Sequence, residues 1–193
     1  MEPNQPPGKV WTYDELPTPT DGSRWEIFDG ELVVSAAPSM WHQEVLRRLY
    51  EAARHLQQQK IAMVFFAPLD IVLSPTRVVE PDLLVVRWDR RKASFAKHAL
   101  EQAPDLVMEV LSPSNTAHDR VRKRRFYARN GIREYWIVDP EDKTIEVLEL
   151  IPGGLSYRQA GWYASGDTAK SILFDLAVEL DPLLLHPLDE EDD

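Results

Sequence analysis

The stretch Pro104-Asp-Leu-Val-Met-Glu109-Val-Leu-Ser112 decides the fold of this chain. Residues 106–111 are too few and too apolar on both faces for a surface helix, so they predict a central strand that is covered on both sides. Glu109 interrupts this apolar run. Because an ionised carboxylate without a partner is too costly to keep in such a strand, we expect Glu109 to be protonated, paired with a cation or bound to a metal ion.

The segment that follows this strand predicts a helix. Asn115 or Thr116 can cap its N-terminus, and the Asn-Gly pair at residues 130–131 ends it. At about 100° per residue, Lys123 lies on the same face as the aromatic side chains of this helix. Its ammonium group then either extends past the rings to solvent or leans over the sheet towards Glu109.

The composition indicates a globular protein with an acidic surface and one basic segment. The chain has 193 residues, of which 44% are hydrophobic, and a formal net charge of −10. This charge argues against broad, non-specific nucleic-acid binding. Residues 119–133, however, contain seven basic residues and one acid. They form either a local basic surface or solvated faces without a ligand.

The distribution of residue types predicts a single cytoplasmic domain. We expect a loose N-terminus over residues 1–10, a domain over residues 11–187 and an acidic, disordered tail over residues 188–193. No apolar run approaches the length of a membrane span, and the first residues lack the basic and apolar regions of a signal peptide, so we expect no membrane segment. The absence of cysteine excludes disulfides and thiolate metal sites.

Several further segments predict β-strands. The Asp29-Gly30 pair between two apolar runs predicts a β-hairpin over residues 24–35, to which we assign a structural role. Further strands are expected at residues 61–66, which can continue past Pro68 to residue 73, and at residues 77–87, 134–139, 144–150 and 155–163. Together with the helices, these strands indicate a mixed α/β fold.

Residues 40–59 predict an amphipathic helix. Its apolar stripe consists of residues at helical spacing, namely Val45, Leu49, Ala52 and Leu56. His42 and His55 lie on the same helix 13 residues apart, far from the i, i+4 spacing of a helical metal pair. We therefore assign no chemistry to either histidine.

Two Pro-Asp pairs precede apolar strands, at residues 81–82 and 104–105, and strand geometry distinguishes them. Asp105 and Glu109 belong to one strand, where their Cα atoms stand roughly 13 Å apart, too far to share one cation. Asp82 belongs to another strand. If the two strands are neighbours, a lateral spacing of roughly 5 Å lets Asp82 and Glu109 converge on one divalent metal ion.

These residues together indicate a site that cleaves phosphodiesters. Paired carboxylates, waters and a backbone carbonyl, such as that of Val110, suit Mg²⁺ or Mn²⁺. Lys123 beside such a site can orient or deprotonate a water molecule and stabilise charge that develops on a phosphate. Asp82, Glu109 and Lys123 therefore predict metal-assisted hydrolysis of a phosphodiester.

The sequence around these residues resembles a known protein family. The resemblance rests on four ordered blocks, Trp25-Glu-Ile-Phe-Asp-Gly-Glu-Leu32, Glu80-Pro-Asp-Leu83, residues 104–114 and Gly131-Ile-Arg-Glu-Tyr-Trp-Ile-Val-Asp139. These blocks are similar to those of the Uma-two family of restriction-endonuclease-like proteins, within the PD-(D/E)XK nuclease superfamily. The superfamily's usual lysine is absent, since Leu111 stands two residues after the acid. Uma-two proteins carry it on the following helix, which points to Lys123.

The resemblance implies an α/β fold of the α+β type, with a restriction-endonuclease-like core, a mixed sheet flanked by helices and an added N-terminal hairpin. It also implies that Asp82 and Glu109 are metal ligands, that DNA is a better candidate than RNA for the nucleic-acid partner, and that the protein is a homodimer. Asp119 would pair with Lys123 and hold its rotamer. We further expect three basic side chains to contact the nucleic-acid backbone, Arg120, Arg122 and Arg124.

The sequence thus predicts a metal-dependent endonuclease, but one alternative stays open. A catalytically inactive nucleic-acid-binding protein, or a structural oligomer, can retain the nuclease fold, since fold alone does not establish activity. Asp82, Glu109 and Lys123 would then form a buried ion network. The presence of all three residues favours the enzyme.

Overall fold

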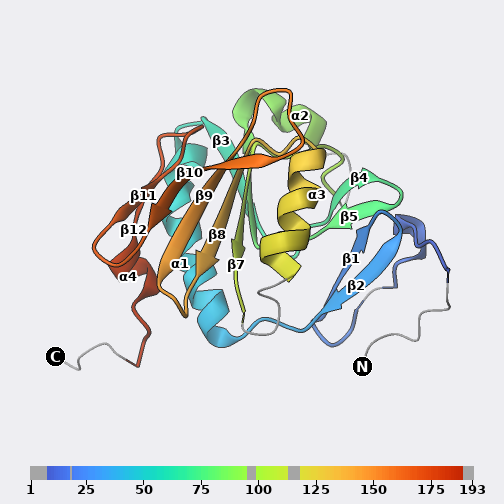
Figure 1. Ribbon diagram of the computed structural model, residues 1–193, viewed down its shortest axis with the longest axis horizontal. Coiled ribbons are helices and arrows are strands. Elements are labelled where there is room, and N and C mark those ends of the chain that lie inside the picture. The colour runs from blue at the N-terminus through green and yellow to red at the C-terminus, as the bar shows by residue number, and fades with distance from the viewer. Residues whose placement is uncertain (1–7, 18, 95–98, 113–117, 189–193) are drawn as a thin grey trace.

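A mixed six-stranded sheet forms the centre of the molecule (Figure 1). Its strands, in spatial order, are β10 (Tyr157–Tyr163), β9 (Thr144–Leu150), β8 (Glu134–Asp139), β7 (Leu106–Val110), β6 (Leu83–Arg87) and β3 (Ala62–Phe66). β7 and β8 run parallel, and the other neighbouring strands of this sheet are antiparallel. The structure is a computed structural model that describes residues 8–17, 19–94, 99–112 and 118–188.

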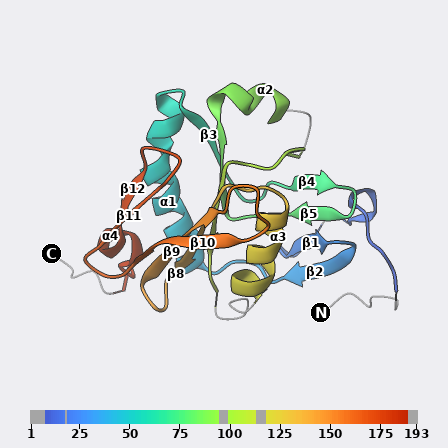
Figure 2. The same cartoon turned by 45° about the horizontal axis from the view of Figure 1, so that its top comes forward.

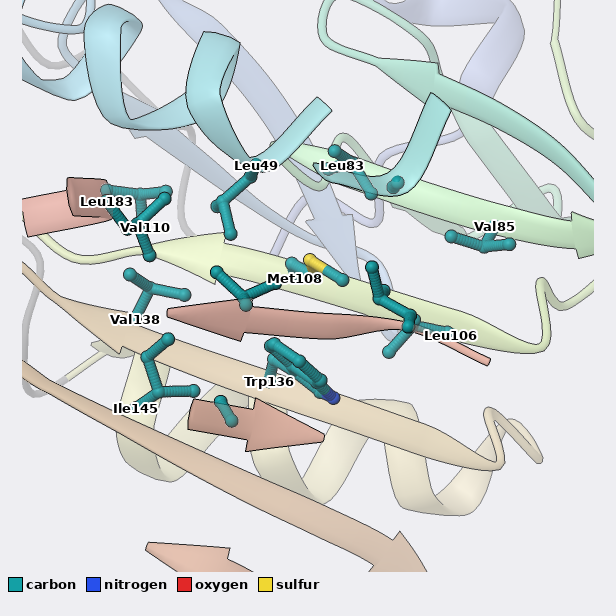
Figure 3. Packing of buried hydrophobic residues seen from close by; sticks show 14 of the residues in the cluster. Leu49, Leu83, Val85, Leu106, Met108, Val110, Trp136, Val138, Ile145 and Leu183 are labelled. Carbon is teal, nitrogen blue, oxygen red and sulfur yellow. The ribbon is translucent and has the colours of Figure 1, made fainter. Parts of the chain in front are cut away.

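Helices cover both faces of this sheet, with α1 (Met40–Gln58) on one face and α3 (Arg124–Arg129) on the other. Side chains alternate between the faces of a strand. Leu106 and Met108 of β7 therefore share a core with α1, as Figure 3 shows. Glu109 points to the opposite face and contacts the segment around α3. The central strand is covered on both sides, as its sequence predicts.

The buried face of α1 contains three of the four residues predicted for its apolar stripe and three further residues. The buried residues of α1 are His42, Val45, Leu46, Leu49, Ala53 and Leu56. Ala52 is only partly buried. Because His42 and Leu46 extend the buried face on one side, its centre is displaced towards Ala53 and away from Ala52.

A second sheet, of four antiparallel strands, lies beside α3 (Figure 2). Its strands, in spatial order, are β2 (Glu31–Ser35), β1 (Arg24–Phe28), β5 (Arg77–Val79) and β4 (Ile71–Ser74). β1 and β2 form the predicted hairpin. Asp29 and Gly30 have φ values of 51° and 90°, as the commonest two-residue hairpin turn requires. A Cβ at Gly30 would come within 2.7 Å of the Val10 side chain, which excludes larger residues.

Two of the expected strands are interrupted near prolines. The expected strand over residues 77–87 consists of β5 and β6, which belong to different sheets. Pro81 between them has no N–H group for a strand ladder. Likewise, the chain does not continue past Pro68 in one sheet, because β3 and β4 also belong to different sheets. The break at Pro81 places Asp82 immediately before the first residue of β6.

The helix expected over residues 115–130 is described from residue 118 onwards. It starts as a π-helical segment, His118–Lys123, and continues as α3. π-Helical turns are frequent at functional sites. The proposed caps, Asn115 and Thr116, lie outside the described residues, as do residues 1–7 and 189–193 of the two expected loose ends.

The remaining elements are short. They are η1 (Tyr13–Glu15), η2 (Trp88–Arg90), α2 (Arg91–Ser94), β11 (Thr168–Lys170), β12 (Ala177–Glu179) and α4 (Leu180–Leu184). In the parts of the chain that the structure covers, no helix has the length and apolar character needed to cross a membrane.

The packing of α1 on the sheet predicts the effect of truncating its core. Leu49 is fully buried in the cluster that joins α1 to the sheet. Leu49→Ala should lower the free energy of unfolding by about 2–5 kcal/mol, because it removes buried methyl groups and leaves a cavity. Urea denaturation measures this loss. Leu155→Ala is the matched control, since Leu155 is 70% exposed, and a loss as large as that of Leu49→Ala there would contradict the assignment of the core.

Candidate active site

A cavity of about 270 Å³ lies where both sheets, the start of α1 and the start of the α3 segment meet. All four residues that the sequence places in the site line this cavity, namely Asp82, Glu109, Val110 and Lys123. The carboxyl groups of Asp82 and Glu109 and the ammonium group of Lys123 are almost fully buried. The cavity is therefore small and highly charged, and exposed residues such as Ala36 and Ala37 line its opening.

Glu109 and Lys123 form a direct ion pair. Lys123 Nζ lies 2.9 Å from Glu109 Oε1 and 3.3 Å from Glu26 Oε1. The Tyr127 hydroxyl donates a hydrogen bond to the same oxygen of Glu109. Burial, followed by the charge of Glu109, raises the pKa of Tyr127 well above its usual value, which keeps this hydroxyl a donor. Of the two orientations open to Lys123, the structure has the one directed at Glu109.

Three polar groups contact the carboxylate of Asp82. Its Oδ2 accepts a hydrogen bond from the main-chain N–H of Val110 at 2.7 Å and lies 3.1 Å from His42 Nε2. Its Oδ1 pairs with the Arg24 guanidinium. Burial alone would raise the pKa of Asp82, but the hydrogen bond with His42 and the charge of Arg24 outweigh it and hold that pKa below its usual range. Asp82 is therefore anionic at neutral pH.

The strand arrangement explains why Asp82, and not Asp105, lies near Glu109. β6 and β7 are antiparallel neighbours in which Leu83 pairs with Met108. The condition that the sequence left open, adjacency of the two strands, is thus met. Asp105 instead accepts a hydrogen bond from the Arg87 main chain at 2.9 Å and forms an ion pair with Arg90, away from the cavity.

The hairpin contributes two charged groups that the sequence analysis did not place in the site. Arg24 and Glu26 of β1 both line the cavity, so the hairpin has more than the structural role that we expected. The sequence did contain one signal that Glu26 belongs to the site, because Glu26 interrupts an apolar run as Glu109 does. The second partner of Arg24 is Glu80, at 3.3 Å from its Nε. Burial raises the pKa of Glu80 to about 7, although the charge of Arg24 opposes this rise.

His42 was also missed. It lies in the first turn of α1, where the Ser39 side chain accepts a hydrogen bond from its main-chain N–H. Its Nε2 lies 3.1 Å from both Asp82 Oδ2 and the carbonyl oxygen of Val110. The helical spacing correctly excluded a His42–His55 pair, but it carried no information on partners that come from strands.

The three arginines expected to contact nucleic acid lie outside this cavity, and each pairs with an acid. The pairs are Arg120 with Asp139, Arg122 with Glu31, and Arg124 with Glu146. Their contact with nucleic acid stays a prediction. The predicted pairing of Asp119 with Lys123 involves a side chain outside the described part of the structure.

The donor atoms of the cavity can be compared with the needs of a divalent cation. Among the described residues, no three His, Asp or Glu side chains are grouped so as to hold a metal ion. Oxygen donors are nevertheless available from the carboxylates of Asp82 and Glu109 and from the main-chain carbonyl of Val110. Asp82 Oδ2 and the Val110 carbonyl oxygen lie near each other, since both are 3.1 Å from the same nitrogen of His42. This donor set fits Mg²⁺ or Mn²⁺.

A mixed sheet flanked by helices, with paired carboxylates and a lysine at its centre, defines a restriction-endonuclease-like protein. Residues 11–181 match the model of the Uma2 family, described as "putative restriction endonuclease", and the chain belongs to this family. The crystal structure of a "putative nuclease belonging to DUF820" from Anabaena variabilis is similar, with a TM-score of 0.73 and 20% sequence identity over 90% of this chain and 97% of that chain. None of the curated proteins compared with the chain matches it. The expected family and fold class are thereby confirmed.

The Glu109–Lys123 pair predicts a measurable coupling. Lys123→Met should lower the free energy of unfolding by about 3–5 kcal/mol, because it leaves buried carboxylates without their counter-charge. Adding Glu109→Gln should recover about 1–3 kcal/mol of this loss, which a double-mutant cycle in urea measures. The control cycle uses Arg124→Met and Glu146→Gln, a more exposed pair at 3.4 Å, where coupling should stay below about 1 kcal/mol. Equal coupling in both cycles would contradict the buried pairing.

Proposed function

We propose that this protein is a metal-dependent endonuclease that hydrolyses phosphodiester bonds in DNA. The observation that carries the proposal is the ion pair between Lys123 Nζ and Glu109 Oε1, 2.9 Å apart, in a cavity that Asp82 also lines. Burying charged groups costs several kcal/mol each, and apolar residues of similar size stabilise a sheet as well or better. Such a cluster is therefore better explained by chemistry than by stability.

The residues of the cavity have different proposed roles in the reaction. Asp82, Glu109 and the Val110 carbonyl would hold Mg²⁺ or Mn²⁺, which supplies an acidified water molecule and neutralises charge on the phosphate. Lys123 acts from the α3 side of the sheet, where it orients or deprotonates the attacking water and donates a hydrogen bond to a phosphate oxygen.

Family membership supports the finer parts of the proposal. These are DNA rather than RNA as the substrate, a homodimer as the assembly and the cytoplasm as the location. Arg120, Arg122 and Arg124 are proposed to contact the nucleic-acid backbone. Their carboxylate partners do not prevent this, because partly exposed ion pairs contribute only about 0–1 kcal/mol and a phosphate can replace the carboxylate.

A second candidate function is a catalytically inactive nucleic-acid-binding or structural protein with the same fold. It is favoured by ion pairs that already occupy the site, because Asp82 pairs with Arg24, and Lys123 pairs with Glu109 and Glu26. In that case the network would serve the folded structure alone, and no metal ion would bind.

Cleavage assays distinguish the two candidates. Wild-type protein should cut labelled plasmid with Mn²⁺ or Mg²⁺ and not with EDTA, and single-stranded DNA and RNA in parallel reactions identify the polymer. Glu109→Gln should lower the rate by about 10²-fold or more, and Lys123→Ala should lower the rate while leaving metal binding intact.

Glu149→Gln is the matched control, because Glu149 lies on β9 and pairs with Arg158 outside the cavity. Full activity of Lys123→Ala would refute the role of the lysine. No cutting of any polymer, together with no Mn²⁺ binding, would favour the second candidate.

A further inference from the structure

His42 is held by the proposed metal ligands. Its side chain is buried, and its Nε2 lies 3.1 Å from Asp82 Oδ2 and 3.1 Å from the Val110 carbonyl oxygen. Both oxygens are hydrogen-bond acceptors, since Asp82 is anionic, so Nε2 must carry a hydrogen. One N–H group therefore stands between two oxygens that are both proposed to bind a cation.

The opposite side of the imidazole ring is not anchored. Nδ1 of His42 is buried without a hydrogen-bond partner among the described residues. His55, on the same helix, differs: its Nδ1 and Nε2 lie 2.8 Å and 2.7 Å from the carbonyl oxygens of Ala52 and Asp175. Buried polar groups usually have a hydrogen-bond partner, so the unpaired Nδ1 needs an explanation. Hydrogen bonds hold the ring of His42 at Nε2, through the two oxygens in front of it.

The spacing of these donors suits a shared cation. In an octahedral complex, adjacent ligand atoms are separated by √2 times the metal–ligand distance, which is about 3.0 Å for ligand distances of about 2.1 Å. The two separations at His42 Nε2 are 3.1 Å each. Nε2 therefore already stands at the distance expected of a ligand adjacent to Asp82 Oδ2 and to the Val110 carbonyl.

We propose that His42 Nε2 is a ligand of the divalent cation, together with Asp82 and the Val110 carbonyl. In this arrangement the ring hydrogen lies on Nδ1, and the lone pair of Nε2 is directed at the cation. This inference rests on the proposed function, because it assigns one more ligand to the same site. An imidazole ligand raises the affinity for transition-metal ions, including Mn²⁺, Co²⁺ and Ni²⁺, relative to Mg²⁺.

Pulsed electron paramagnetic resonance of Mn²⁺ bound to the full-length protein tests this proposal without relying on activity. The spin-echo modulation should contain a ¹⁴N coupling from imidazole, and the coupling should change when histidine is labelled with ¹⁵N. His42→Gln should remove the coupling and weaken Mn²⁺ binding about 10-fold or more, with a smaller effect on Mg²⁺. His55→Gln is the matched control and should keep both the coupling and the affinity.

The outcomes separate this inference from the proposed function. Mn²⁺ that binds to wild-type protein without a nitrogen coupling would overturn the role of His42 and leave the oxygen-ligated metal site standing. Failure of wild-type protein to bind Mn²⁺ at all would overturn both. The wild-type spectrum decides the question even if His42→Gln does not fold.

Discussion

The buried ion pair between Glu109 and Lys123 is the constraint on which the other parts of the structure depend. A carboxylate in the apolar centre of β7 is tolerated only with a cation beside it. The cation comes from the segment that follows β7, and its reach fixes how the π-helical segment and α3 lie across the sheet. Phe126 and Tyr127 then pack on that face, so the apolar contacts of α3 and the buried ion pairs of Lys123 require the same helix position.

The need to balance buried charges also explains how the second sheet contributes to the site. Lys123 alone does not complete the cavity, because Arg24 and Glu26 of the hairpin close it and Arg24 neutralises Asp82. The lining contains three carboxyl groups, Arg24 and Lys123, which together give a formal charge of −1 with His42 counted as neutral. A divalent cation is attracted by such a surplus, and a phosphate can follow once the cation is bound. The hairpin thus contributes to the charge balance of the site.

The sequence was sufficient where local periodicity determines orientation. The apolar run of β7 and the helical face of Lys123 could be derived without knowledge of the fold, because strand and helix periods are local properties. Asp82 needed one further assumption, the adjacency of β6 and β7. His42 and Arg24 could not be derived, since they approach the site from α1 and β1, whose positions depend on packing of the whole chain. The break at Pro81 was missed because the apolar run resumes directly after Asp82.

The position of the lysine shows that a lysine can reach the same carboxylate from a different position in the sequence. Leu111 stands where the superfamily usually has its lysine, and it belongs to the apolar cluster that faces α3. Residues 109 and 111 share one face of the strand, so a lysine at 111 and a lysine on the covering helix approach Glu109 from the same side. With the ammonium group supplied by the helix, position 111 can hold an apolar residue that packs with Phe126. The proposed chemistry requires a cation at Glu109, and either backbone position satisfies that requirement.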